Sequence, residues 1–365
     1  MSFTTSSQIP INAEISDIRT SSEFKGISFS NFKKTEVKNQ LIENIKRGKI
    51  EPACYWCAEL VCSGHFMDIW EIVIHYLGKH IHLGNPKLAV YLERRYTIFR
   101  NIMVQGHYVT ELDLRNNINI RKLFVEMICI LSISNKKPSF EAIKINKVEE
   151  FDITQMTERL KAPSVKYIDS IFQSKDPKEL FIPLNEFAYN LSNEKRNINN
   201  ACYWIEWIIE FDIICKNKKE QCRAVKRNQY HVESKLQRDV IWIVWDIILH
   251  YSNETENPFI ITTINALLEL FCIKYTTGSS KKRKYLLYFA VELLTEPVQS
   301  DIEMISDKNI VHVVVEKVNE LYRQIKKNEK GPNVGYLYSN LESAASFEQS
   351  LQKIELINSM TNFEI

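Results

Sequence analysis

Apolar positions recur at helical spacing along most of the chain. From Lys33 onward they recur at three- and four-residue steps, as Val37, Leu41 and Ile45 do, which is the spacing of one face of an α-helix. Most of these segments are longer than typical strands, so the pattern predicts an all-α protein, with room for one or two short strands where Ile is frequent. Beyond the first helix, the predicted helical segments are 51–63, 66–78, 87–104, 118–133, 178–192, 200–215, 238–251, 259–275, 283–295, 308–327 and 340–358.

Four short blocks of sequence occur twice in the same order. The pairs are 53–56 with 201–204 (ACYW in both), 70–76 with 245–251 (WEIVIHY and WDIILHY), 85–86 with 257–258 (NP in both) and 121–122 with 283–284 (RK in both). Chance rarely produces ordered matches that include Trp, Cys and His. The blocks therefore predict two tandem copies of a multi-helix unit.

These boundaries divide the chain into five parts. They are an N-terminal arm at 1–32, helical repeat 1 at 33–150, a linker at 151–175, helical repeat 2 at 176–300, and C-terminal helices and a tail at 301–365. The second copy is the longer one because a basic insertion, 216–238, separates its first two blocks. We expect the arm and the terminal helix at 340–358 to contact neighbouring molecules.

Composition excludes several classes of protein. Lys and Arg total 47 against 45 Asp and Glu, and a net charge of +2 is too small for the whole chain to coat a polyanion. Hydrophobic residues make up 45% of the chain, which excludes wholesale disorder. The most apolar stretch, 240–249, is too short to span a membrane. The eight Cys lack the compact spacing of a disulfide scaffold, so we expect reduced thiols in a cytosol-like compartment.

Positive charge is concentrated on the basic insertion, where Tyr230 and His231 stand between the cations. Such a segment follows a phosphate backbone, docks an acidic partner protein, or is a solvated loop. A second basic run, 281–284, opens a predicted helix, where the helix dipole disfavours cations unless an anion is near. The candidate contacts for an anionic partner or nucleic acid are Lys216, Lys218, Lys219, Arg223, Lys226, Arg227, Lys235 and Arg238.

One cysteine–histidine spacing invites a zinc interpretation. Cys54, Cys57, Cys62 and His65 follow the pattern C-x2-C-x4-C-x2-H. On one continuous helix, however, the last two residues lie two turns beyond the first two and do not complete a tetrahedron. Cys57 also aligns with Ile205 of the second copy, which indicates an apolar position.

Other signs of catalysis are weak in the sequence. His75, His80 and His82 lie near the end of a predicted helix, where imidazoles cap or pack. The duplicated ACYW block is typical of close helix packing, with an aromatic binding pocket as the alternative. The chain contains no P-loop, nucleophile-elbow or zinc-protease motif. We therefore predict no catalytic centre, cofactor or metal.

Residues 45–99 resemble the collar-forming region of clamp-loader-related ATPases. The residues that support the resemblance are Arg47-Gly48, Ala53, Tyr55-Trp56, Ala58 and Asn85-Pro86. In that family the region joins subunits and follows the ATPase module. Because only 44 residues precede the match, the resemblance implies the assembly role alone.

The chain also resembles uncharacterised proteins of nucleocytoplasmic large DNA viruses, above all at 53–72 and 79–88. Its frequent Ile, Asn and Lys suit an AT-rich genome. The resemblance implies a viral setting: the host cytoplasm, at the virus factory, and the virion.

Together these observations favour a non-catalytic helical scaffold or adaptor of a viral assembly, such as a minor capsid protein. Its expected partners are other proteins of that assembly, and a homo-oligomer is compatible with the same role. The alternative is a DNA-replication accessory of clamp-loader-collar type, which binds DNA or a replication protein through the basic insertion. A third class, an enzyme whose site forms only in the fold, has no motif in its favour.

Overall fold

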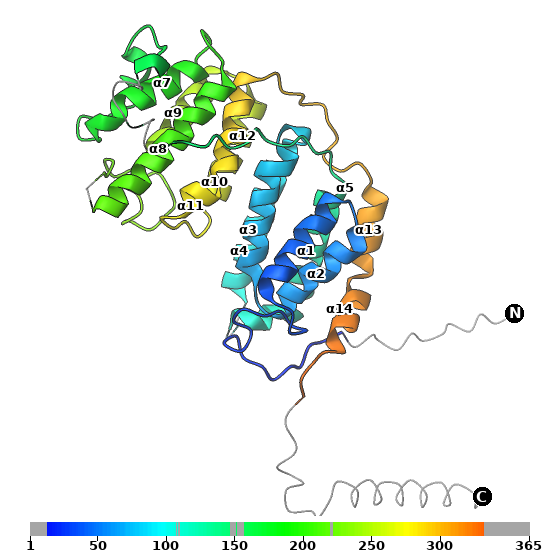
Figure 1. Ribbon diagram of the computed structural model, residues 1–365. Helices are drawn as coiled ribbons and strands as arrows, with labels where there is room; N and C mark the ends of the chain where they lie inside the picture. Colours follow the sequence, from blue (N-terminus) through cyan, green and yellow to red (C-terminus); the bar gives the residue numbers. More distant parts are fainter. Residues whose placement is uncertain are drawn as a thin grey trace, which may run out of the picture.

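The computed structural model describes residues 13–106, 108, 110–146, 151, 157–219 and 222–331, and every regular element in these ranges is helical. The all-α prediction is confirmed. Two groups of helices lie side by side in Figure 1. The first holds α1 (Lys34–Lys46), α2 (Ile50–Cys62), α3 (Phe66–Tyr76), α4 (Lys87–Gln105) and α5 (Ile118–Ile133). The second holds α7 (Phe181–Leu191), α8 (Ile198–Lys218), α9 (Ile241–Glu254), α10 (Pro258–Cys272), α11 (Ser279–Lys282) and α12 (Lys284–Thr295).

Short helical turns and two further helices also lie within the described ranges. Five short helical turns are η1 (Leu77–Ile81), η2 (His82–Gly84), η3 (Glu111–Asn116), η4 (Lys166–Ile168) and η5 (Lys178–Leu180). The segment predicted as one helix at 308–327 is divided at Lys317 into α13 (Lys308–Glu316) and α14 (Val318–Lys326). Both return to the first group, where α13 packs on α5 and α14 packs on α2.

Asparagine side chains fix two of the helix starts. The amide oxygen of Asn117 accepts from the backbone N–H of Asn119 and Ile120 at the start of α5. Asn257 caps α10 in the same way, and Pro258 occupies the first turn. These caps place α5 and α10 close to the predicted segments 118–133 and 259–275.

Helices that carry matching sequence blocks form similar contacts in the two groups. The blocks that occur twice lie on α2 and α8, α3 and α9, the starts of α4 and α10, and the starts of α5 and α12. In both groups the first of these helices contacts the fourth, as α2 does α5 and α8 does α12. Buried Trp70 on α3 contacts Phe99 on α4, with ring centroids 5.9 Å apart. Its counterpart Trp245 contacts Phe271 on α10 at 5.3 Å. These recurrences support the predicted duplication.

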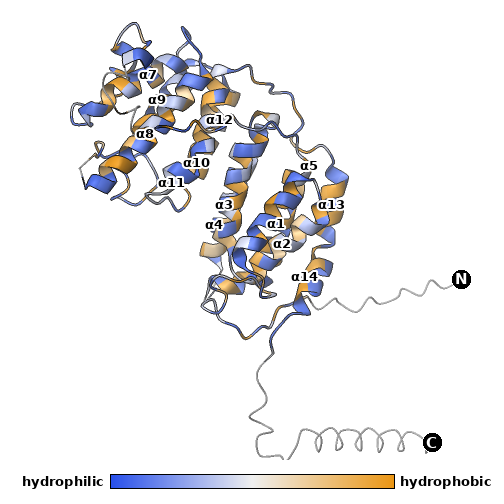
Figure 2. Ribbon diagram, viewed as in Figure 1, coloured by the Kyte–Doolittle hydropathy of each residue, from blue (hydrophilic) through white to orange (hydrophobic). Residues whose placement is uncertain are grey.

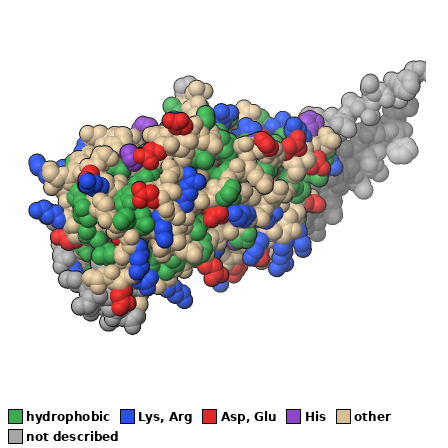
Figure 3. Space-filling view, turned by 90° about the horizontal axis from the view of Figure 1, so that it is seen from above, with side chains coloured by type: hydrophobic (Ala, Val, Ile, Leu, Met, Phe, Trp, Pro, Cys, Tyr) green, Lys and Arg blue, Asp and Glu red, His purple; other side chains and the backbone are tan. Residues whose placement is uncertain are grey.

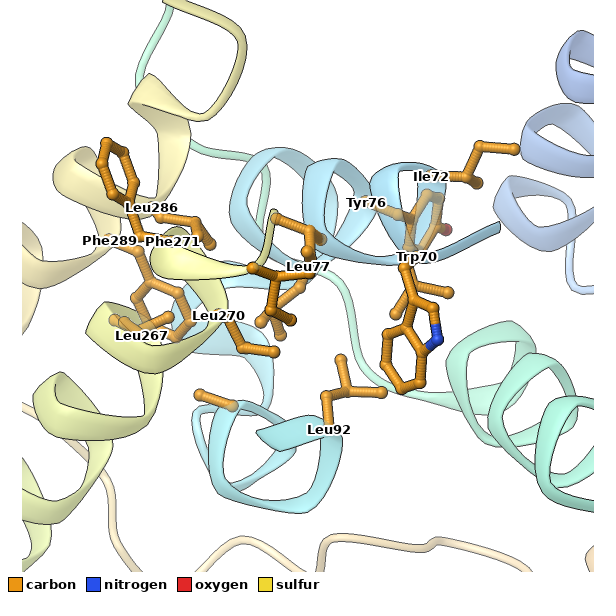
Figure 4. Packing of buried hydrophobic residues seen from close by; sticks show 14 of the residues in the cluster. Trp70, Ile72, Tyr76, Leu77, Leu92, Leu267, Leu270, Phe271, Leu286 and Phe289 are labelled. Carbon is orange, nitrogen blue, oxygen red and sulfur yellow. The ribbon is translucent and has the colours of Figure 1, made fainter. Parts of the chain in front are cut away.

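The two groups share one hydrophobic core. Figure 4 shows Trp70 and Leu92 of the first group in one cluster of buried side chains with Leu270 and Phe271 of the second. Helices α4 and α10 pack directly against each other. Gly78 permits a second close approach, because a Cβ there would lie 2.9 Å from the backbone carbon of Tyr285. The groups are therefore halves of a single body.

Charged side chains also join the halves. Buried Arg283 on the second half pairs with Glu71 on α3. Glu292 on α12 pairs with fully buried His82 and, at 2.9 Å, with Lys137. Burial opposes ionisation of Glu292, but the hydrogen bonds and charges of His82 and Lys137 hold its pKa below the ordinary value.

The predicted arm differs from the structure over residues 13–32. Ala13, Ile15, Phe24 and Phe29 are buried in the core of the first half. The buried carboxylate of Glu59 accepts hydrogen bonds from Ser28, Ser30 and Tyr55. The lead-in is therefore an integral layer of the first half, while residues 1–12 of the predicted arm lie outside the described ranges.

Residues 157–175 of the predicted linker contact α7. The carboxylate of Glu186 accepts from the backbone N–H of Lys161 and Ala162, and Asn185 accepts from that of Tyr167. The linker is thus fastened to the second half.

Surface helices show the expected amphipathic pattern, with apolar and polar residues on different faces in Figure 2. On α14, Val318, Tyr322 and Ile325 are buried while the residues between them are mostly polar. In the described part of the chain, every helix is too short or too polar to cross a membrane. The helix predicted at 340–358 lies outside the described residues.

Candidate anion-binding pocket

Five of the eight candidate basic residues line one pocket beside the end of α8. Its volume is about 500 Å³, and its wall also includes Leu236, Asp239 and Thr277. The cations that line it are Lys216, Lys219, Arg223, Lys235 and Arg238, all of them exposed. We call this site the basic pocket. Lys218 and Lys226 are exposed but lie outside it.

The backbone explains why these residues converge. Helix α8 ends at Lys218, and Lys219 adopts the left-handed conformation with φ of 59° that turns the chain away. The basic insertion then folds back on itself, because the N–H of Ala224 donates to the carbonyl of Arg238 at 2.9 Å. The two ends of the insertion therefore meet beside the last turn of α8.

Arg227 does not belong to the exposed basic surface that was predicted for it. Its guanidinium is buried and pairs with Asp176 at 2.6 Å and with Asp246 at 3.0 Å. It also donates to the carbonyl of Val225 at 2.8 Å. Since every one of these partners belongs to the chain itself, Arg227 anchors the insertion to the second half and does not reach a ligand.

Tyr230 is likewise unavailable for stacking on nucleic-acid bases. Its ring is buried and stacks on Trp242 with centroids 4.5 Å apart, and its hydroxyl donates to Asp246. Trp242 in turn donates its indole N–H to the carbonyl of Leu236 at 2.7 Å. His231 remains exposed and lies 3.4 Å from Glu269.

Carboxylates that line the pocket or pair with its lining lysines neutralise part of its charge. Lys216 lies 2.5 Å from Asp212 and 3.9 Å from Asp239, and Lys235 lies 2.7 Å from Glu233. Lys219, Arg223 and Arg238 form no ion pair with any described residue. These three cations are the ones available to a ligand.

The two carboxylates beside Lys216, those of Asp212 and Asp239, have pKa values above that of an ordinary aspartate. Burial raises the pKa of Asp212, and the nearby charge of Asp239 raises it further. Burial also raises the pKa of Asp239, although Lys216, the hydroxyl of Tyr275, 3.0 Å away, and the nearby charge of Arg223 oppose the shift. As the pH falls, both groups become neutral earlier than ordinary aspartates.

We expect anion binding to the basic pocket to strengthen as the pH falls from neutrality into the acidic range where these two carboxylates protonate, because protonation of Asp212 or Asp239 removes negative charge and releases Lys216. A peptide rich in cysteic acid is a suitable probe, since its sulfonates keep their charge over this range. Fluorescence anisotropy measures the affinity. Asp239→Asn should reduce the pH dependence, and an equally steep profile in this variant would contradict the assignment.

Cations of the second basic run, 281–284, form ion pairs with carboxylates of the same chain. Lys281 pairs with Glu210 at 2.8 Å, Lys284 pairs with Glu206 at 2.8 Å, and Arg283 pairs with Glu71. The expectation that an anion lies near this helix start is met by the protein's own carboxylates. The run therefore gives no independent sign of an external partner.

The cysteines and histidines that suggested zinc take part in packing. Cys54, Cys57 and Cys62 are buried on α2, and burial raises the pKa of their thiols. His65 donates from Nε2 to the carbonyl of Ile27 at 2.8 Å. Within the described ranges, no group of three or more His, Cys, Asp or Glu side chains is arranged to hold a metal ion.

The site is thus a concave, mixed-charge surface with three available cations, which suits a compact anionic group more than an extended strand. The sequence identified the cations but not the carboxylates Asp212 and Asp239, which only the fold brings beside Lys216. Comparison of the chain with protein-family models, curated proteins and solved structures found no match.

Proposed function

We propose that this protein is a non-catalytic helical adaptor that holds an acidic segment of a partner protein in the basic pocket. The observation that supports the proposal is the convergence of Lys219, Arg223 and Arg238, none of them ion-paired among the described residues, on one concave site. A rigid body made of two joined halves presents this site at a fixed distance from its other surfaces, as an adaptor requires.

An acidic protein segment fits the pocket better than nucleic acid does. Binding along a nucleic-acid backbone uses a positively charged groove together with aromatic side chains for stacking, whereas Tyr230 is buried. On the face drawn in Figure 3, acidic and basic side chains are interspersed instead of forming one basic field. Nucleic acid stays the second candidate, because exposed Lys218 and Lys226 extend the positive charge beyond the pocket.

The viral setting is a further proposal that rests on the resemblance at 53–72 and 79–88. In that setting the adaptor acts in the host cytoplasm, at the virus factory, and as a structural component of the virion such as a minor capsid protein. The alternative is a replication accessory. Quantitative proteomics of purified particles separates these roles, since a structural component is present there in stoichiometric amounts.

We expect the double variant Arg223→Glu, Arg238→Glu to lose polyglutamate binding by about tenfold or more, because two attractive contacts become repulsive. The control is Lys218→Glu with Lys226→Glu, which changes the net charge equally at exposed positions outside the pocket. It should change the affinity only slightly. Fluorescence anisotropy with a labelled polyglutamate peptide measures both.

Two outcomes contradict the proposal. Equal losses in the two double variants would mean that the general charge of the insertion, and not the pocket, attracts the peptide. Tighter binding of single-stranded DNA than of the peptide, with a steep salt dependence, would favour the replication accessory instead.

A further inference from the structure

A second concave surface lies where the two halves meet. It is a groove of about 520 Å³ between the first turns of α4 and α10. Its floor is apolar and comes from Val90 and Tyr91 on α4, Phe259 on α10, and Met304 on the segment that follows α12. We call it the joint groove, because neither half alone forms it.

The rim of the joint groove is positively charged. We use the word rim for Lys87 and Arg94, the two charged residues that line the groove, and none of the residues that line it is acidic. Neither cation forms an ion pair with a described residue, and Arg94 is exposed. The backbone amides at the start of α10 are already satisfied by the Asn257 side chain, so the positive charge of the rim comes from the two side chains.

The separation of Lys87 and Arg94 along α4 indicates the length of a ligand that contacts both cations. Lys87, Val90, Tyr91 and Arg94 follow the i, i+3, i+4, i+7 pattern of one helix face. Seven residues of helix rise about 10 Å, so the two cations lie about two helical turns apart along α4. A short helix laid into the groove would place apolar side chains on the floor and carboxylates at both ends.

We propose that the joint groove binds a short amphipathic helix of a partner protein, with apolar anchors at helical spacing over Val90 and Phe259 and acidic residues that pair with Lys87 and Arg94. This contact is separate from the basic pocket and does not depend on it. It gives the adaptor a second binding surface, and because the area is small we expect an affinity of about micromolar or weaker.

The charges and the floor disfavour other occupants. In a symmetric contact with a second copy of this chain, the groove would face itself and bring the two pairs of cations together. A nucleic-acid backbone would meet the cations but would also bury charged phosphates against Val90, Phe259 and Met304. An acidic amphipathic helix satisfies both the rim and the floor.

A displayed library of helical peptides, each about three turns long, tests the proposal on the full chain. We expect selection to enrich peptides with apolar residues at i and i+3 or i+4 and with Asp or Glu near both ends. Selected peptides should bind Arg94→Glu about tenfold more weakly than the wild type. Arg100→Glu is the matched control, because Arg100 is exposed on the same helix outside the joint groove.

Exchange of the charges between peptide and protein tests the predicted ion pair with Arg94 directly. A selected peptide with Lys in place of its acidic residues should bind Arg94→Glu better than it binds the wild-type protein. The proposal is overturned if no such peptides are enriched, or if Arg94→Glu and Arg100→Glu weaken binding equally. It is also overturned if sedimentation shows that Arg94→Glu dissociates a dimer, since the occupant would then be a second copy.

Discussion

Replacement of Arg227 with Met is expected to lower the free energy of unfolding by about 3–5 kcal/mol, because it leaves buried carboxylates without their cation. The Asp176 side chain is fully buried, and Arg227 lies 2.6 Å from it. Burial alone would raise the pKa of Asp176, but the hydrogen bonds from Arg227 and the backbone hold it below the ordinary value. Without Arg227, the charged form of this carboxylate becomes costly.

Urea denaturation of both proteins measures the loss. Lys226→Met is the matched control, since it removes the same charge at the neighbouring, exposed position and should change the stability by less than about 0.5 kcal/mol. If Arg227→Met were as stable as the control but bound anionic peptides more weakly, Arg227 would be a ligand contact as the sequence first indicated.

Lys226 is exposed and Arg227 is buried, and the sequence alone does not predict this difference between two adjacent cations. Helical periodicity tells the buried face of α2 or α10 from the exposed face, and most predicted helices match the structure within a few residues. The basic insertion has no such period in the described residues, so neighbouring cations look alike. The partners of Arg227 lie 51 and 19 residues away, and only the fold brings them to it.

The helix dipole argument predicts that anions lie near the cations at 281–284, but it does not identify which residues supply them. The cations at 281–284 required nearby anions, and the structure provides Glu71, Glu206 and Glu210. Glu71 belongs to the other half of the molecule, 212 residues away from Arg283. The dipole argument predicted a negative charge, but the contact between the halves, which supplies it, cannot be derived from helix periodicity.

Ser and Thr interrupt the apolar pattern of the lead-in at 13–32, and this pattern predicts an arm. Ser28 and Ser30 are among the polar residues that fasten it, through hydrogen bonds to the buried carboxylate of Glu59. The amino-acid composition does not distinguish serines that form such hydrogen bonds in the folded protein from serines that are exposed to solvent. The same holds for Tyr230, an aromatic residue among cations that packs inward.

Replacement of either Trp70 or Trp245 with Ala is expected to lower the free energy of unfolding by about 3–5 kcal/mol, since each removes a large, fully buried side chain. The predicted duplication assigns the two residues to equivalent places, and each contacts a phenylalanine of the following long helix, Phe99 on α4 or Phe271 on α10. Losses of similar size are therefore expected in the two halves. Because the core is continuous between them, each variant should unfold in a single transition.

The matched controls are Trp70→Phe and Trp245→Phe. Neither indole N–H has a hydrogen-bond partner among the described residues, so phenylalanine loses volume but no hydrogen bond. Each should cost clearly less than the alanine variant. A large loss at Trp70 with almost none at Trp245, or two separate unfolding transitions, would mean that the halves are not equivalent, jointly stabilised units. In that case the repeated blocks would preserve short sequence motifs without preserving a common core.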